Sequence, residues 1–292
     1  MDAVITYVDC LDPVWQQTYK ENVDAPLNVE RFRDWGTLPY LLRGIERHMP
    51  FIKNVYLIVA SESQVPKWAS SKLNIVYHKD IIPQELLPTF NSTTIEMFLH
   101  KIPGLDEQYV YFNDDMFPVK KMKAEDFFVN GKPRIDFVTR KISNENSYQY
   151  QCKNSCDFSR KVTGNEIKQE YIRPQHSAVP FKKSICEDLF DKYEEEIVGR
   201  CSKLRENKNF NQYLFADYAY YTNNVVVKEF KYKYFSLRES VWEICQFMRN
   251  PDSTIMCIND SHELTKKTFT NFKKTLLAVF QQILPKKSKY ET

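Results

Sequence analysis

The sequence contains no long apolar run. None of its 292 residues lies in a stretch approaching the roughly 18 consecutive apolar residues that a membrane-spanning helix needs. The apolar opening, residues 1–8, is too short for a signal peptide and lacks a basic start. Low-complexity tracts and internal repeats are also missing. We therefore expect a cytoplasmic globular protein without a membrane span or a repeat architecture.

Cysteine is sparse and irregularly spaced. The seven cysteines are an odd number and are scattered, which argues for reduced thiols in the cytosol and against a disulfide framework. Cys152 and Cys156 are the only close pair in the sequence. A zinc ion there would need two further ligands, and no second close pair supplies them. We expect no zinc site at this pair.

Neither sign of charge dominates. A net charge of +3 is too small to indicate nucleic-acid binding, although it is compatible with a phosphorylated substrate. The composition is that of a globular protein, with 42% hydrophobic and 27% charged residues and only 6 glycines. The length exceeds the usual domain of about 100–200 residues. One α/β domain with an insertion, or two tightly packed lobes, would fit.

Apolar runs typical of strands alternate with segments typical of helices. Strands are expected at 2–8, 54–60, 73–78, 108–112, 225–231, 233–237 and 254–258, and helices at 37–48, 91–100, 185–198 and 209–221. This alternation predicts a largely parallel sheet flanked by helices. The periodicity weakens over 121–172, where an insertion is expected that binds an acceptor or forms a lid. Residues 263–284 predict a C-terminal amphipathic helix.

Acidic residues follow three of the expected strands. These residues and one neighbouring amide are Asp9, Asp12, Asn113, Asp114, Asp115 and Asp260. Ligands of open α/β sheets bind beyond the carboxyl ends of the strands. Carboxylates there are costly unless they are paired or bound, and Mg²⁺ takes carboxylate and phosphate oxygens. The pattern favours a metal–diphosphate site with nucleotide recognition near Asp9 and Asp12. The alternative is a set of ordinary polar turns.

Other candidate site residues are basic or lie near helix starts. Arg31, Arg33 and Arg43 could bind phosphate through the bidentate guanidinium, although surface arginines are common and solvent exposure is the more frequent case for any one of them. Asn91 or Ser92 can cap the helix at 91–100, and we count Asn91 among the substrate-binding candidates.

Three further residues complete the candidate set. Glu96 lies nineteen residues before Asp115, and a Pro-Gly turn can bring both to the same end of the sheet. His176 precedes a helix and could act as base or acid near neutral pH, or serve structure alone. Arg205 stands before the helix at 209–221, where it could help bind an anion or be an ordinary flanking charge.

Taken together, four blocks resemble the Stealth family of sugar-1-phosphate transferases, which includes bacterial capsular-polysaccharide phosphotransferases and the catalytic subunit of the lysosomal-enzyme GlcNAc-1-phosphotransferase. The first block is DAVITYVDCLDPVW, and the long second block begins at RFRDWGTLPY and ends with LPTFNSTTIE and YVYFNDDMF. The third is RPQHSAVPFKKS, and the fourth comprises the Arg205 helix and CINDS. The second block is highly specific, and the blocks with the segments between them span most of the chain.

The resemblance implies transfer of a sugar-1-phosphate from a nucleotide-sugar, typically a UDP-sugar, to an acceptor hydroxyl. It implies a Rossmann-like or GT-A-like fold over 1–292 and a divalent metal, Mg²⁺ or Mn²⁺. By the same resemblance, Glu96, Asp115, His176 and Arg205 are the active-site residues. On chemical grounds, Asp115 together with Asp114 or Asp260 would then bind the metal, and Arg205 would bind the phosphate. His176 would be the base, with Glu96 as second choice.

Two departures from the family pattern stand out. The first block reads Asp9-Cys10-Leu11-Asp12 where a Gly is frequent, and Glu206 and Asn207 follow Arg205 in the fourth. The chain lacks the extra modules of the lysosomal-enzyme subunit, which favours a bacterial capsule or surface-glycan enzyme with a glycan or lipid-linked glycan acceptor.

Alternative interpretations concern reaction and location. An ordinary metal-dependent glycosyltransferase that releases UDP would also keep acidic residues after a strand. A non-catalytic glycan-binding subunit would keep the aromatic residues but not all four active-site candidates. The lysine-rich helix at 263–284 could pack on the domain or lie on an anionic membrane surface as a peripheral contact.

Overall fold

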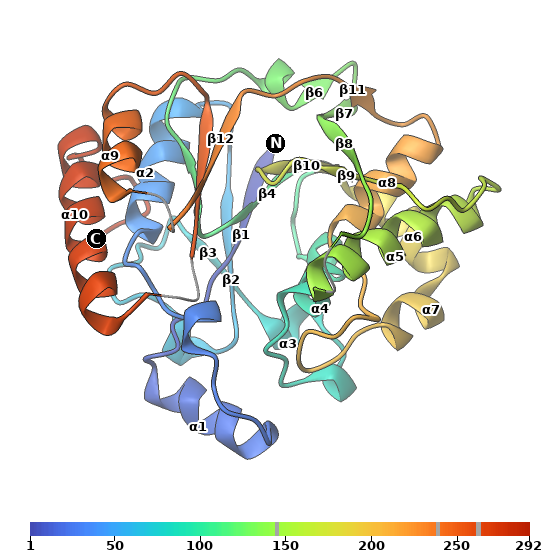
Figure 1. Ribbon diagram of the computed structural model, residues 1–292, viewed down its shortest axis with the longest axis horizontal. Helices are drawn as coiled ribbons and strands as arrows, with labels where there is room; N and C mark the ends of the chain where they lie inside the picture. Colours follow the sequence, from blue (N-terminus) through green and yellow to red (C-terminus); the bar gives the residue numbers. More distant parts are fainter. Residues whose placement is uncertain (144–145, 238–239, 261–263) are drawn as a thin grey trace.

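The computed structural model describes residues 1–143, 146–237, 240–260 and 264–292, and it is built around one central sheet (Figure 1). Within these residues the strand order is β10-β4-β1-β2-β3. The strands are β1 (Asp2–Thr6), β2 (Val55–Val59), β3 (Asn74–Tyr77), β4 (Gln108–Asn113) and β10 (Val179–Lys182). All neighbours pair in parallel except β10, which runs antiparallel to β4. The predicted α/β class with a largely parallel sheet is confirmed.

The middle residues of the central strands are apolar on both faces of the sheet, because helices cover both faces. Successive residues of a strand point to opposite faces. Accordingly, Ala3 and Ile5 of β1 belong to one core cluster and Val4 belongs to the other, and all three are fully buried. This two-sided burial explains the short continuous apolar runs in the sequence.

Two groups of helices form the outer layers (Figure 1). The first face carries α2 (Leu38–His48), α9 (Val241–Arg249) and α10 (Lys266–Ile283). The second carries α4 (Ser92–Glu96), α5 (Ser147–Val162), α6 (Lys183–Lys192), α7 (Glu194–Gly199) and α8 (Tyr213–Tyr221). Helix α1 (Pro13–Asn22) belongs to a separate aromatic cluster, and the one-turn helix α3 (His78–Ile81) follows β3. Figure 1 shows α1 extending away from the sheet.

The remaining strands form smaller sheets. The strands β12 (Tyr232–Ser236), β13 (Ile255–Asn259) and β5 (Met116–Pro118) form one sheet in that order. A second contains β11 (Val226–Val227), β7 (Lys132–Ile135) and β6 (Phe128–Val129), and β8 (Phe137–Arg140) pairs with β9 (Tyr171–Pro174). Short 3-10 helices occur at Val29–Arg31, Glu62–Gln64, Gln84–Leu86, Leu99–Lys101 and Ala124–Asp126.

The segment 121–172 is more ordered than its composition suggests. It contains α5, whose inner face buries Cys152, Ser155 and Cys156 against the core. This part of the expected insertion is therefore a packed helix, in which Ser155 donates to the Asn211 side chain and Ser159 donates to the Leu214 carbonyl of α8. Residues 144–145, part of the expected excursion, lie outside the described residues. A role of this segment in acceptor binding stays a prediction.

Helix α10 packs its apolar face against the domain. Leu276, Val279 and Phe280 are buried, and the Phe280 ring lies 5.0 Å from Tyr40 and 4.7 Å from Phe117 between centroids. The predicted helix start at 263 lies outside the described residues. In the part of the chain that the structure describes, no helix combines the length and apolarity needed to cross a bilayer.

Replacing Phe280 by Ala should test whether this helix belongs to the core. A buried Phe truncated to Ala typically loses about 3–5 kcal/mol of unfolding free energy. We expect a loss of this size in urea unfolding, whereas Lys274→Ala, on the exposed side of the same helix, should change it by less than about 0.5 kcal/mol. Equal stability of the two variants would show that α10 does not stabilise the domain.

Candidate active site

A cleft of about 1030 Å³ opens at the carboxyl ends of β1, β4 and β13. Sequence-predicted residues that line it are Arg31, Arg33, Glu96, Asn113, Asp114, Asp115, His176, Arg205 and Asp260. They come from segments far apart in the chain, and the parallel sheet brings them to one edge. The cleft also contains aromatic residues that the sequence analysis did not single out, among them Trp15, Tyr148, Tyr213 and Tyr234.

Asp115 lies in the tight turn from β4 to β5, where it meets β13. Its backbone carbonyl accepts the N–H of Ile258 at 2.9 Å, and its Oδ2 accepts from the Cys257 thiol at 3.3 Å. Within the described residues, Oδ1 is buried and has no hydrogen-bond partner. Burial raises the pKa of Asp115, and nearby His176 opposes this rise. A buried carboxylate oxygen without a donor is suited to binding a cation.

Asp114 adds a second acidic group beside Asp115. Burial, together with the negative charges of Asp115 and Asp34, raises the pKa of Asp114 to about 8. Adjacent carboxylates in one pocket disfavour each other's ionisation. A bound divalent cation would relieve this repulsion, so the acidic pair fits a metal site.

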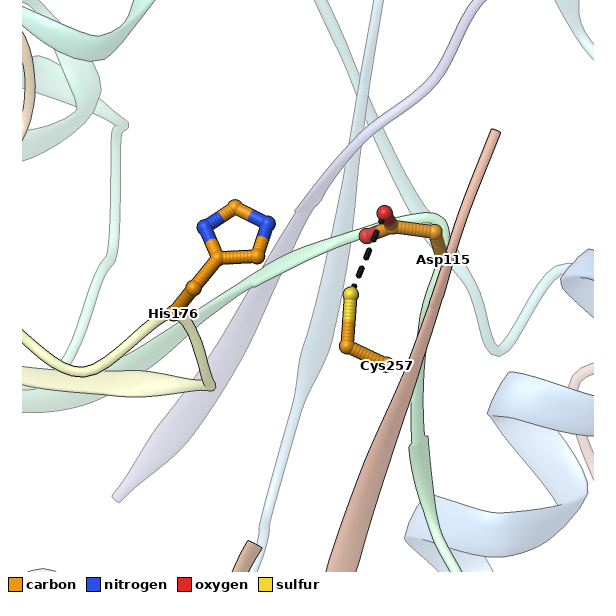
Figure 2. Close-up of side chains that lie close together, drawn as sticks. All are labelled: Asp115, His176 and Cys257. Carbon is orange, nitrogen blue, oxygen red and sulfur yellow. Dashed lines mark hydrogen bonds between the residues drawn. The ribbon is translucent and has the colours of Figure 1, made fainter. Parts of the chain in front are cut away.

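His176 follows β9 and lies beside Asp115 in the cleft. Its Nδ1 lies 3.5 Å from the Tyr213 hydroxyl, and Figure 2 shows the other ring nitrogen, Nε2, turned toward the Asp115 carboxylate. Burial lowers the pKa of His176, the Asp115 charge raises it, and Arg173 and Arg205 lower it. The imidazole is therefore favoured in its neutral form, which can accept a proton or bind a metal.

Cys257 is a site residue that the sequence analysis missed. Atoms of Asp115, His176 and Cys257 that can bind a metal lie within 4.8 Å of one another (Figure 2). The only signal in the sequence is alternation, which places Cys257 and Asn259 on one face of β13. The unpartnered oxygen of Asp115 fits a divalent ion here. The mixed oxygen, nitrogen and sulfur set suits a transition ion better than Mg²⁺.

Asp260 lies in the cleft but is engaged elsewhere. Arg33 donates two hydrogen bonds of 2.6 Å to its two carboxylate oxygens, and Trp35 Nε1 donates to Oδ2 at 3.1 Å. The structure therefore does not bring Asp260 into the group around Asp115. Arg33, expected to bind phosphate, instead neutralises Asp260 and lies over the Phe269 ring.

Glu96 lies at the start of α8, where the sequence analysis expected a bound anion. Its Oε2 accepts the N–H of Gln212, which precedes α8, at 2.9 Å, and its Oε1 lies 3.5 Å from the Tyr111 hydroxyl. Burial raises the pKa of Glu96 to about 7, opposed by the Gln212 N–H and by Arg205. The structure therefore brings Glu96 and Asp115 into one cleft, as predicted.

Arg205 lies on the loop before α8, eight residues ahead of the helix itself. Its Nη2 donates to Ser92 Oγ at 2.6 Å, and the side chain is otherwise exposed to the cleft. Asn91 stabilises this loop, because its Nδ2 donates to the carbonyls of Ser202 and Leu204 at 3.1 and 3.2 Å. Asn91 does not line the cleft and instead positions the loop that carries Arg205.

Three other predicted binding residues serve the scaffold. Asp12 caps α1 through the N–H groups of Val14 and Trp15, and Asp9 Oδ1 accepts the N–H of Leu11 at 2.8 Å. Arg43, expected to reach phosphate, is buried on α2. It forms a 2.7 Å ion pair with Glu291 and donates to the Leu284 carbonyl. None of these three lines the cleft, because turn and core partners take up their polar atoms.

Comparison with known proteins finds similar sequences among bacterial polysaccharide phosphotransferases. Residues 31–135 match the family model described as Stealth protein CR2, conserved region 2. A capsular polysaccharide phosphotransferase of Actinobacillus suis is 32% identical over 257 residues, covering 82% of this chain and 69% of the relative. A receptor polysaccharide phosphotransferase of Streptococcus oralis is 28% identical, covering 100% and 99%.

Solved structures give a weaker comparison. The galactosyltransferase LgtC in complex with donor and acceptor sugar analogues aligns over 95% of this chain and 96% of its own, at 9% identity and a TM-score of 0.43. A likeness at this level supports no inference about the reaction. The sequence relatives and the family model together show that the chain is an enzyme of the transferase class and belongs to the Stealth family.

Proposed function

We propose that this enzyme transfers a hexose- or N-acetylhexosamine-1-phosphate from a UDP-sugar to a hydroxyl of an acceptor glycan. The product is a phosphodiester, the released nucleotide is UMP, and the pathway is capsular or surface polysaccharide synthesis in a bacterium. The supporting observation is the convergence of Glu96, Asp115, His176 and Arg205 in one cleft. The polysaccharide phosphotransferases named above support the same reaction class.

The proposed reaction is attack by the acceptor oxygen on the sugar-bearing phosphorus. The new P–O bond forms as the P–O bond to UMP breaks, and the hydroxyl proton passes to Nε2 of neutral His176. Arg205 binds the sugar-linked phosphate as a charge-assisted donor. A bound Mg²⁺ or Mn²⁺ would neutralise phosphoryl charge, and Asp115 and Asp114 are the residues proposed to hold it.

Two roles of His176 exclude each other. An Nε2 bound to metal together with Cys257 could not also accept the hydroxyl proton. We favour the base, because the Tyr213 hydroxyl contacts Nδ1 and leaves Nε2 as the other ring nitrogen of this cleft-lining residue, and because hard cations prefer the carboxylates of Asp114 and Asp115. Glu96 then acts through α8, where it accepts the N–H of Gln212, next to Tyr213.

We further propose that the enzyme works in the cytoplasm, where it meets a glycan or lipid-linked glycan acceptor. Peripheral membrane contact, if the enzyme makes it, would use the exposed lysines of α10, because its apolar face packs inward. Lys266, Lys267 and Lys274 are exposed on that helix.

The identity of the released nucleotide tests the proposed reaction. The enzyme is incubated with a UDP-sugar, a crude acceptor glycan and Mg²⁺ or Mn²⁺, and the nucleotide is identified by chromatography and the product by ³¹P NMR. We expect UMP, a phosphodiester in the product, and loss of turnover on addition of EDTA. UDP with a phosphate-free glycosidic product would establish the glycosyltransferase alternative instead.

His176→Gln should separate base from metal ligand. As a base, the residue contributes about 10²–10⁴-fold to turnover, so kcat falls by this factor even at saturating metal, and Mn²⁺ affinity measured by electron paramagnetic resonance is unchanged. Asp115→Asn serves as the comparison, because it should weaken Mn²⁺ binding. If His176→Gln weakens Mn²⁺ binding as much as Asp115→Asn does, His176 is a ligand.

The raised pKa of Glu96 predicts a stability that depends on pH. The pKa of this carboxyl is about 4.5 in the unfolded chain and about 7 in the folded protein. Its contribution to the free energy of unfolding is therefore complete below pH 4.5 and is lost as the pH rises to about 7. The expected loss is about 3 kcal/mol. Urea unfolding of the wild type relative to Glu96→Gln, measured without metal from pH 4.5 to 8, checks this. A constant difference across the range would show normal ionisation of Glu96.

A further inference from the structure

One part of the cleft is not used by the proposed transfer chemistry. It is lined by Arg140 of β8, Arg173 of β9, Tyr148 of α5, and Tyr232 and Tyr234 of β12. We call these five residues the arginine–tyrosine wall. In Figure 1, β8, β9 and α5 lie on the side of the central sheet that carries α8. The wall adjoins the reaction centre, because Arg173 is three residues before His176, no more than about 10 Å along the chain.

Strand register places the two arginines on the same face. Arg173 pairs directly with Val138, and Arg140 pairs with Tyr171. Directly opposed residues share a face, and so do residues two apart on one strand. Arg140 is two residues after Val138, so its side chain and that of Arg173 project from one side of the β8–β9 pair. Both line the cleft, so that side faces the substrate space.

Within the described residues, neither guanidinium has a carboxylate partner. Among the residues that the structure describes, the ion pairs of this region are Lys141 with Glu170, and Lys153 and Arg160 with Asp157. None of them involves Arg140 or Arg173. Arg173 donates to the carbonyl of Pro174 at 2.7 Å, and Arg140 donates to that of Thr139 at 3.1 Å.

In the described part of the chain, no ion pair therefore neutralises the positive charge of the wall. Burial raises the pKa of the Tyr232 hydroxyl, and the charges of both arginines lower it. Asp136, in the β7–β8 connection, raises it. The Asp136 carboxylate accepts the N–H of Phe230 at 3.3 Å and forms no ion pair within the described chain. Arg173 is half-buried. Binding an anion stabilises a half-buried cation that lacks an ion-pair partner more than it stabilises an exposed one.

The tyrosines give the wall a second chemical character. The guanidinium carbon of Arg173 lies 5.8 Å from the Tyr148 ring, and the Tyr234 ring lies 5.7 Å from the His176 ring. Tyr232 donates its hydroxyl to Gln175 Oε1 at 2.7 Å. Tyrosine presents an apolar ring with a polar tip, a combination that fits the apolar face and the hydroxyls of a sugar.

We propose that the arginine–tyrosine wall binds an anionic sugar of the acceptor glycan, with the sugar ring against the tyrosines and its carboxylate or phosphate between Arg140 and Arg173. The proposal rests on the proposed function, because it assigns the acceptor to the side of His176 that carries β9. The donor side, with Arg205 and the Asp115 group, already holds the groups that a diphosphate needs. An acceptor with a charged sugar near its attacking hydroxyl is then preferred over a neutral one.

Binding of small sugars to the full chain tests this inference. Methyl β-D-glucuronide and glucose 6-phosphate represent the carboxylate and phosphate sources, and methyl β-D-glucoside is the neutral probe. By isothermal titration calorimetry we expect at least one charged probe to bind at least about tenfold more tightly than the neutral one. The charged probe that binds better identifies the anionic group.

Variants assign the binding to the wall. Arg140→Gln, at an exposed position, should weaken binding of the charged probe about tenfold and leave UDP binding unchanged. Lys141→Gln removes the adjacent charge, which is paired with Glu170 and does not line the cleft, and should change neither. Arg173→Lys keeps the charge but loses the planar fork and should also weaken charged-probe binding. Circular dichroism confirms that each variant is folded.

Three results would overturn the inference. The first is equal affinity for charged and neutral probes. The second is unchanged charged-probe binding in both folded arginine variants. The third is a loss of UDP affinity in Arg140→Gln as large as the loss for the charged probe, which would assign the wall to the donor. Release of UDP in the reaction assay would overturn the proposed phosphate transfer but not these binding results.

Discussion

The burial of one carboxylate, that of Asp115, organises the site. Asp115 lies where the central sheet meets the β12-β13-β5 sheet, and its backbone and side chain both contact β13. The fold must compensate a carboxylate placed there, and the described protein atoms satisfy only one of its oxygens. The remaining oxygen, the adjacent Asp114 and His176 are the groups to which the proposed function assigns metal binding and proton transfer. Glu96, Asp115, His176 and Arg205 line one cleft around this carboxylate.

Much of this arrangement is predictable because it depends on local pattern and sheet topology. Two-sided burial makes β1, β2 and β4 apolar, and parallel strands deliver the residues at their carboxyl ends to one edge of the sheet. That reasoning brings Asp115 and Glu96 together correctly. It works because the Pro-Gly turn between them is short and the strand after the turn is unambiguous.

Other residues could not be placed because their partners are remote in sequence. Arg33 pairs with Asp260 across 227 positions, and Arg43 pairs with Glu291 across 248. A single sequence shows each of these only as a charge, so a surface residue, a phosphate ligand and a buried ion pair look alike. Cys257 was missed for a related reason, because a thiol inside an apolar strand is indistinguishable from an ordinary core residue.

The start of α8 has a consequence for how the enzyme can change. Two consecutive residues there serve different groups, since the N–H of Gln212 binds Glu96 and the hydroxyl of Tyr213 approaches His176. A shift of the start of α8 therefore disturbs a contact of Glu96 and a contact of His176 at the same time. In the proposed acceptor site, variation in acceptor choice would instead fall to the cleft-facing residues of β8, β9 and β12.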